Sequence, residues 1–124
     1  MRCIRTRGTV ATHDKIRAQL LKGTTPLLVL TVLKDGELYG YEIAQRIRER
    51  SGGAFTPSEG ALYPALHALE ADGALEASWR DGGRGPRRRY YRITKAGLGL
   101  LAQHAQEWAT FSLSIGKVVG GANQ

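Results

Sequence analysis

The sequence predicts a mainly α-helical protein with one small β-hairpin. Three observations predict this class: apolar residues recur at helical spacing along most of the chain, their period changes to two after Gly73, and glycines separate the two segments that follow. With 124 residues, of which 42% are hydrophobic, the chain can bury one modest core. A second independent domain is therefore not expected.

The first third of the chain contains one predicted helix. Residues 1–14 show neither a helical nor a strand period and are predicted to form a flexible arm. A short amphipathic turn is expected over residues 15–22, and Thr25 followed by Pro26 then predicts the start of a helix that ends near Lys34. Apolar residues cover almost the whole circumference of this helix, so it must be buried on several sides, for which a partner subunit would be a simple solution.

Two shorter helices follow. Residues 39–51 place Ile43 and Ile47 on an inner face. The segment Thr56 to Glu59 has the pattern of a capping box with a proline at the first helical position, and it begins a helix that closes at Gly73. The buried stripe of that helix is expected to consist of Leu62, Leu66 and Leu69, and its opposite face carries Glu59, Tyr63, His67 and Glu70.

A hairpin and a long helix complete the chain. Leu75, Ala77 and Trp79 alternate with polar or small residues, as in a half-buried strand, and residues 87–94 form the returning strand. Thr94 is expected to cap a last helix that reaches about residue 120. Small and apolar residues recur on it every three or four positions, which suits a helix–helix seam: Leu98, Leu101, Ala105, Trp108, Ser112, Ile115 and Val119.

The positive charge of the chain is concentrated on this hairpin. There are 18 Lys and Arg against 11 Asp and Glu, a net charge of +7, which attracts polyanions unless it only provides ordinary solubility. From Arg80 to Arg92, six of thirteen residues are arginine and one is an acid. Arginines can neutralise phosphates, and glycines at a hairpin tip let the backbone approach them. The alternative is a charged hairpin that guards the edge of a sheet.

The order of helix, helix, helix, hairpin and helix is typical of the winged helix-turn-helix, whose later short helix, residues 58–72 here, enters the major groove of DNA. Residues 15–94 are expected to form this DNA-binding domain and residues 95–120 a dimerisation helix. Two alternatives stay open: Tyr63 and His67 pack partly against the hairpin, and one of Tyr39 and Tyr41 belongs to the core. The expected DNA contacts are Tyr39, Tyr41, Ser58, Glu59, Tyr63, His67, Arg84, Arg87, Arg88 and Arg89.

Several classes of protein are not supported. The single cysteine, Cys3, allows neither an internal disulfide nor a cysteine-based zinc cluster, which fits a reducing cytoplasm. The apolar run of residues 26–33 is far shorter than the ~20 residues that span a bilayer, and no signal-peptide core follows the N-terminal arginines. No glycine-rich phosphate loop follows a strand, and the histidines are scattered. We therefore expect a cytoplasmic protein without cofactor, metal or enzymatic activity.

Four segments resemble the PadR family of bacterial transcriptional regulators: LLKGTTPLLVLTVL, YGYEIAQRI, SEGALYPALHALEADG and RRRYYRITKAG, in family order and spacing. The resemblance covers Leu20 to about Val118. Family members commonly have threonine at Ala61 and a basic residue at Ala68, so sequence readout at these two positions is expected to differ. The single C-terminal helix resembles the smaller subgroup that includes multidrug-sensing repressors.

This resemblance implies a homodimer that binds a near-palindromic operator on double-stranded DNA, and a repressor that a small aromatic or hydrophobic effector releases. It also implies an effector site at the dimer interface, with Trp108 stacking on flat ligands. Trp108 packing only in the dimer seam is the alternative. A winged-helix adaptor without DNA or effector binding is the second interpretation of the whole chain. His104 and Ser112, each one helical turn from Trp108, are expected to share its face, with Leu27 and Thr31 opposite on the first helix. The expected ligand-binding residues are thus Trp108, His104, Ser112, Leu27 and Thr31.

Overall fold

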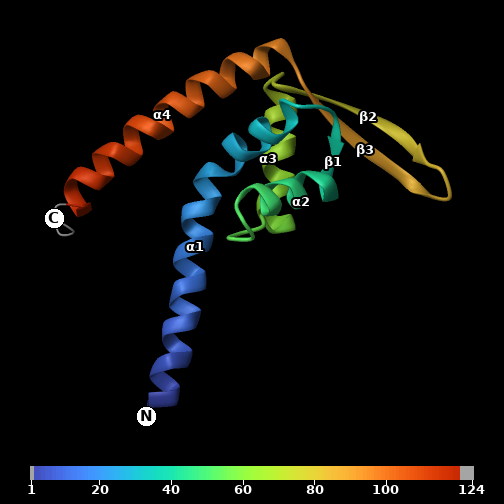
Figure 1. Ribbon diagram of the computed structural model, residues 1–124. Coiled ribbons are helices and arrows are strands. Elements are labelled where there is room, and N and C mark those ends of the chain that lie inside the picture. The colour runs from blue at the N-terminus through green and yellow to red at the C-terminus, as the bar shows by residue number, and fades with distance from the viewer. Residues whose placement is uncertain (1, 121–124) are drawn as a thin grey trace.

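The computed structural model describes the backbone of residues 2–120 and the side chains of residues 15–120. It confirms the predicted fold class and order of elements, and it adds a very short strand before the second helix (Figure 1). The elements are α1 (Arg2–Leu33), β1 (Leu38–Tyr39), α2 (Gly40–Arg50), α3 (Glu59–Ala71), β2 (Leu75–Gly82), β3 (Gly85–Ile93) and α4 (Lys95–Val119).

The N-terminal segment differs from its prediction. Residues 2–14, expected to be a flexible arm, continue α1 as helix, and Met1 lies outside the described residues. Figure 1 shows this part of α1 projecting away from the other elements. A helix that projects needs no apolar stripe, because it has no core to face, and it can grow from the packed turns that follow it. The absence of a hydrophobic period therefore did not exclude a helix.

The predicted helix start at Thr25 and Pro26 is also wrong, because both residues lie inside α1. The Thr25 side chain is buried, and its hydroxyl donates a hydrogen bond to the Leu21 carbonyl oxygen at 2.8 Å, as an interior helical threonine does. Pro26 cannot donate to the preceding turn, and α1 bends in its C-terminal third (Figure 1). Threonine followed by proline thus marks a bend here, and not a helix start.

The C-terminal end of α1 forms the centre of the core. Val29, Leu30, Val32 and Leu33 are all buried within this single chain. The helix therefore does not need a partner to bury these residues, contrary to expectation, and Leu27, Leu28 and Thr31 stay half-buried in the single chain. The core is completed by Ile43 and Ile47 of α2, the predicted stripe Leu62, Leu66 and Leu69 of α3, and Leu38, Ala74, Leu75 and Tyr91 around the sheet.

Helix α3 begins at the start of the predicted range 58–72, later than the Thr56–Pro57 capping signal indicated. Its N-cap is Ser58, whose Oγ accepts a hydrogen bond from the Ala61 backbone N–H at 3.2 Å. Thr56 and Pro57 belong to the loop before it, where Pro57 is buried. A proline packed against the domain in this way fixes the loop and leaves the serine to cap the helix.

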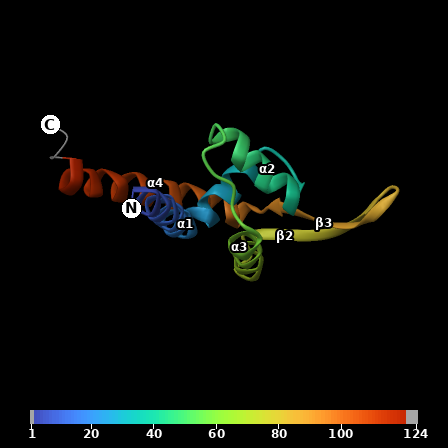
Figure 2. The same ribbon diagram turned by 90° about the horizontal axis from the view of Figure 1, so that it is seen from below.

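The three strands form one antiparallel sheet in the order β1-β3-β2. Strand β3 begins at Gly85, two residues before its predicted start, so the hairpin is longer than expected and turns at Gly83 and Arg84. Gly83 has φ +70°, which favours glycine. The hairpin extends beyond the helices (Figure 2). For this reason Trp79, predicted to be half-buried, is 56% exposed.

Helix α4 starts as predicted. The Thr94 hydroxyl accepts a hydrogen bond from the Gly97 N–H at 3.0 Å, and Gly97 packs so closely on the core that a Cβ there would overlap the Ala74 carbonyl oxygen. Gly97 is also the one fully buried residue that the structure records for this helix. After this anchor α4 runs away from the sheet (Figure 1).

Candidate nucleic-acid interface and the groove between α1 and α4

The exposed face of α3 carries the predicted contact residues Glu59, Tyr63 and His67, with Ser58 at its start. The leucine stripe on the opposite face fixes how this surface is presented. Tyr63 is 38% exposed because its hydroxyl end lies against Gly40, where a Cβ would be 2.5 Å from Oη. Tyr63 therefore packs partly on the N-terminus of α2, and His67 stays exposed.

Tyrosines and arginines cluster where β1 meets the hairpin. The Tyr39 and Tyr90 rings have centroids 5.4 Å apart, and Arg88 lies over Tyr39 at 4.7 Å. Arg80 lies over Tyr90 at 4.4 Å. Cation–π contacts of this kind hold long arginine side chains in place. Tyr39 is half-buried and Tyr41 is exposed, so neither belongs to the core as one of them was expected to.

Acidic residues of the same chain pair with four of the six hairpin arginines. Arg80 pairs with Glu37, Arg92 pairs with Glu76, and Arg89 pairs with Glu70 at 2.7 Å. Counting charges along the sequence therefore overstates the positive field of the hairpin. The exposed arginines nearest its tip are Arg84, at the turn, and Arg87, whose Nε lies 3.8 Å from Asp81.

Arg89 lies against α3 and is half-buried. Its guanidinium also lies 5.7 Å from the centroid of the Tyr91 ring, and its Nε is buried without a hydrogen-bond partner among the described residues. Burial raises the pKa of the Tyr91 phenol, although the charge of Arg89 acts in the opposite direction. This part of the hairpin is thus bound to the protein interior, unlike the tip.

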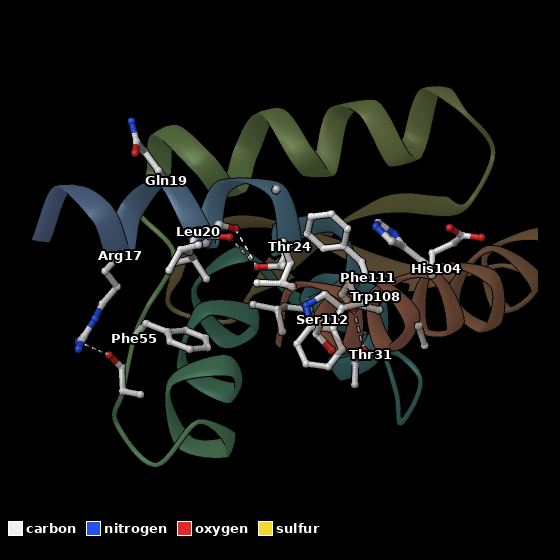
Figure 3. Close-up of a pocket in the computed structure, with 18 residues that line it drawn as sticks. Arg17, Gln19, Leu20, Thr24, Thr31, Phe55, His104, Trp108, Phe111 and Ser112 are labelled. Atoms are coloured by element: carbon white, nitrogen blue, oxygen red, sulfur yellow. Dashed lines mark hydrogen bonds between the residues drawn. The ribbon is translucent and has the colours of Figure 1, made fainter. Parts of the chain in front are cut away.

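A groove of about 1200 Å³ lies between α1 and α4, and all five predicted ligand-binding residues line it (Figure 3). Leu27 and Thr31 come from α1, and His104, Trp108 and Ser112 come from α4. Trp108 is 48% exposed. The structure therefore brings together residues that are more than seventy positions apart in the chain, as the family resemblance implied.

Other residues of the groove were not predicted. Phe111 lies three positions after Trp108, on the same side of α4, so helical spacing contained the signal for it. Phe55 and Ala54 belong to the irregular loop before α3, and no periodicity marks them. Figure 3 shows Phe55 near Arg17, whose guanidinium donates a hydrogen bond to the Ala54 carbonyl at 2.9 Å. The groove thus extends from α4 to the loop that leads into α3.

Metal and membrane sites are not found in the described part of the chain. There, no three His, Cys, Asp or Glu side chains come together as metal ligands. None of the described helices is both long and apolar enough to cross a membrane.

Comparisons with known proteins agree with this architecture. The model of the transcriptional regulator PadR-like family matches residues 29–103. A transcriptional regulator from Clostridium thermocellum is 31% identical with a TM-score of 0.73, covering 80% of this chain and 96% of that one. A PadR family regulator from Eggerthella lenta is 29% identical with a TM-score of 0.72, covering 88% and 89%.

A third protein extends the comparison beyond solved structures. The transcriptional regulator Rv3488 of Mycobacterium tuberculosis is 40% identical over 79 residues, which are 62% of this chain and 68% of that protein. PadR regulators bind DNA and are not enzymes. The chain therefore belongs to the PadR-like family of transcriptional regulators, which confirms the expected winged-helix fold and non-enzymatic role.

Proposed function

We propose that this protein is a cytoplasmic, homodimeric repressor that binds a near-palindromic DNA operator and is released by a small aromatic or hydrophobic effector. The observation that carries the proposal is the pairing of an exposed α3 face with a hairpin whose outer arginines, Arg84 and Arg87, are exposed to solvent, where they can meet phosphates. Helix α3 would enter the major groove, and the hairpin, here called the wing, would lie along the backbone beside it.

The two parts of this surface would have different roles. Ser58, Tyr63 and His67 can reach base edges from α3 and would provide sequence preference, with Glu59 beside them. Arg84, Arg87 and Arg88 would provide affinity by neutralising phosphates. Tyr39 and Tyr41, at the N-terminus of α2, would orient the domain through a phosphate.

The uncovered apolar surface of α4 supports the dimer. Phe111 is 65% exposed, Ile115 47% and Val118 84%, and their helical spacing places them on one side of α4, whereas soluble monomers rarely leave a large contiguous apolar surface in water. A second copy, related by a two-fold axis, would cover these side chains reciprocally. The same axis would place two α3 helices on the two halves of an operator.

The groove supports the effector site. Pockets for drug-sized ligands have volumes of roughly 300–1000 Å³. The groove of a single chain is somewhat larger, at about 1200 Å³, so a partner helix could occupy part of it and leave room for a flat molecule beside Trp108. Aromatic ligands would stack on the indole, and Thr31, His104 and Ser112 would supply polar contacts.

Selection of bound duplexes from a random-sequence DNA library tests the DNA-binding proposal. We expect a near-palindromic consensus, with the preference altered by His67→Ala. Replacing Arg87 and Arg88 by Ala should weaken binding to every sequence while leaving the consensus unchanged. Failure of the unmodified protein to retain any duplex at low salt would favour the adaptor interpretation.

The effector proposal is tested by tryptophan fluorescence. Planar aromatic compounds should quench Trp108 more than Trp79, so the Trp108→Phe protein should lose most of the quenching and the Trp79→Phe protein should keep it. Equal and negligible quenching in both variants would indicate that Trp108 only packs in the dimer seam.

A further inference from the structure

We propose that Glu70 and Arg89 form a clamp that fixes the orientation of the wing relative to α3, so that Arg89 is a positioning residue and not a phosphate contact. This inference rests on the proposed DNA-binding function. It also revises the role that the sequence predicted for Arg89. The clamp would set the distance between the two surfaces that must meet the DNA together.

The geometry of this pair differs from that of the other hairpin ion pairs. Arg89 Nη2 lies 2.7 Å from Glu70 Oε2, and the two side chains are only 32% and 30% exposed. In the Arg92–Glu76 pair the exposed fractions are 52% and 63%. An ion pair that is partly shielded from water is screened less by solvent and salt, so the clamp is the more effective of the two.

The position of the Glu70–Arg89 pair explains why it would control the orientation of the wing. Among the ion pairs of the described residues, this is the one that joins the hairpin to α3. Two residues further along β3, Tyr91 is buried in the core, and in the other direction the strands run out to the tip. Arg89 therefore lies where the hairpin leaves the core, and a change of angle there moves the tip furthest.

The Arg89 side chain already makes its contacts within the protein. Its Nε is buried without a hydrogen-bond partner among the described residues, and its guanidinium lies over the Tyr91 ring. To reach a phosphate, the side chain would have to leave both the Glu70 carboxylate and this ring. Arg84 is exposed at the turn, and Arg87 is 64% exposed with its Nε 3.8 Å from Asp81, so a phosphate can reach both without breaking a shielded ion pair.

The two roles predict opposite effects of Glu70→Gln. If Arg89 were a phosphate contact, removing the competing carboxylate would free it and would also remove a negative charge near the DNA, so binding would tighten. If the pair is a clamp, the wing loses its fixed orientation and binding weakens. The sign of the change therefore separates the two roles.

The affinity of the whole chain is measured for a duplex selected from the random library. Glu70→Gln should weaken this binding about fivefold, which corresponds to the free energy of one ion pair. Glu76→Gln, which removes a carboxylate from the neighbouring pair within the hairpin, is the matched control and should not weaken it. The double change of Glu70→Arg with Arg89→Glu should restore most of the affinity. Equal or tighter binding by Glu70→Gln would overturn the clamp.

A second readout requires no DNA. Trp79 lies opposite Arg89 in the sheet, and Trp108→Phe leaves it as the single tryptophan. In that background, time-resolved fluorescence anisotropy of Trp79 should show faster local motion after Glu70→Gln and unchanged motion after Glu76→Gln. Unchanged motion in both would overturn the clamp. Absence of duplex binding by the unmodified protein would instead overturn the proposed function, and the Trp79 motion would still decide the clamp.

Discussion

The wing and α4 both leave the core and are exposed over most of their length, but they differ in what they expose (Figure 1). The wing carries arginines, half of which meet a glutamate of the same chain. Helix α4 carries large apolar side chains, among them Phe111 and Val118, that the described chain does not cover. The charges of the wing are thus largely balanced within one chain, whereas α4 leaves an apolar surface that the proposed dimer would cover.

Physical chemistry explains the difference. Water solvates charged side chains, so a basic hairpin can project from a small domain without a partner to cover it. Exposed apolar area costs about 25 cal/mol per Å², so a long helix with several exposed large apolar residues gains from a partner.

The anchor of α4 should be the most sensitive position. Gly97→Ala places a Cβ against the Ala74 backbone carbonyl, which cannot move aside as a side chain could, and should lower the free energy of unfolding by about 3 kcal/mol. Gly99→Ala, two residues further along, meets open space and should stabilise the protein by up to about 1 kcal/mol. Urea unfolding followed by circular dichroism measures both. Similar losses in the two variants would show that α4 does not depend on this contact.

The exposed face of α4 should hold the subunits together. Phe111→Asp puts a charge into the proposed interface and should weaken association by about 2 kcal/mol, or roughly thirtyfold. Gln106→Asp on the polar side of the same helix should leave association unchanged. Sedimentation equilibrium measures the change. A monomeric unmodified protein, or equal effects of the two variants, would contradict the view of α4 as half of an interface.

The wing tip should control the salt dependence of DNA binding. Replacing Arg84 and Arg87 by Ala should lower affinity and reduce the slope of log K against log salt by about 0.9 for each phosphate that the protein no longer neutralises. Arg92→Ala, which removes an arginine already paired with Glu76, is the control and should leave the slope unchanged. If Arg92→Ala changed the slope as much as the pair of tip substitutions, the assignment of the phosphate contacts to the wing tip would be wrong.

The junction of the wing with the core should give the smallest effect. Because burial raises the pKa of Tyr91 above 10.0, the folded protein keeps this proton at a pH where the unfolded chain releases it. The contribution of the protonated Tyr91 phenol to the free energy of unfolding is therefore fully present below pH 10. It is lost as the pH rises through the pKa of Tyr91 in the folded protein. Tyr91→Phe should show a shallower loss of stability above pH 10 in urea unfolding. Parallel curves for the two proteins would contradict this account of Tyr91.

Local patterns in the sequence predicted much of the fold. The stripe of Leu62, Leu66 and Leu69 and the Thr94 cap depend on residues a few positions apart, and both are found as expected. The Thr25–Pro26 signal failed because it looks the same at a helix start and at a bend inside a longer helix. Local sequence could not show that the Thr25 hydroxyl bonds to the preceding turn.

The contacts within the candidate sites join residues that are far apart in the chain, so local sequence patterns alone could not predict them. The pairing of Arg89 with Glu70 and of Arg80 with Glu37 joins residues 19 and 43 positions apart, so counting charges along the hairpin could not show which arginines are neutralised. The groove residues Trp108, His104, Ser112, Leu27 and Thr31 were expected from the family resemblance, and they do line one groove. Phe55 was missed because an irregular loop has no periodic pattern.

Binding of duplex DNA by a dimer, through α3 and the wing, can be measured in one experiment. It is a fluorescence anisotropy titration of a labelled duplex selected from the random library, repeated over a series of salt concentrations. We predict saturation at two chains per duplex and an affinity that falls steeply and linearly in log salt. Absence of binding at low salt, or saturation at one chain with an affinity insensitive to salt, would contradict the account.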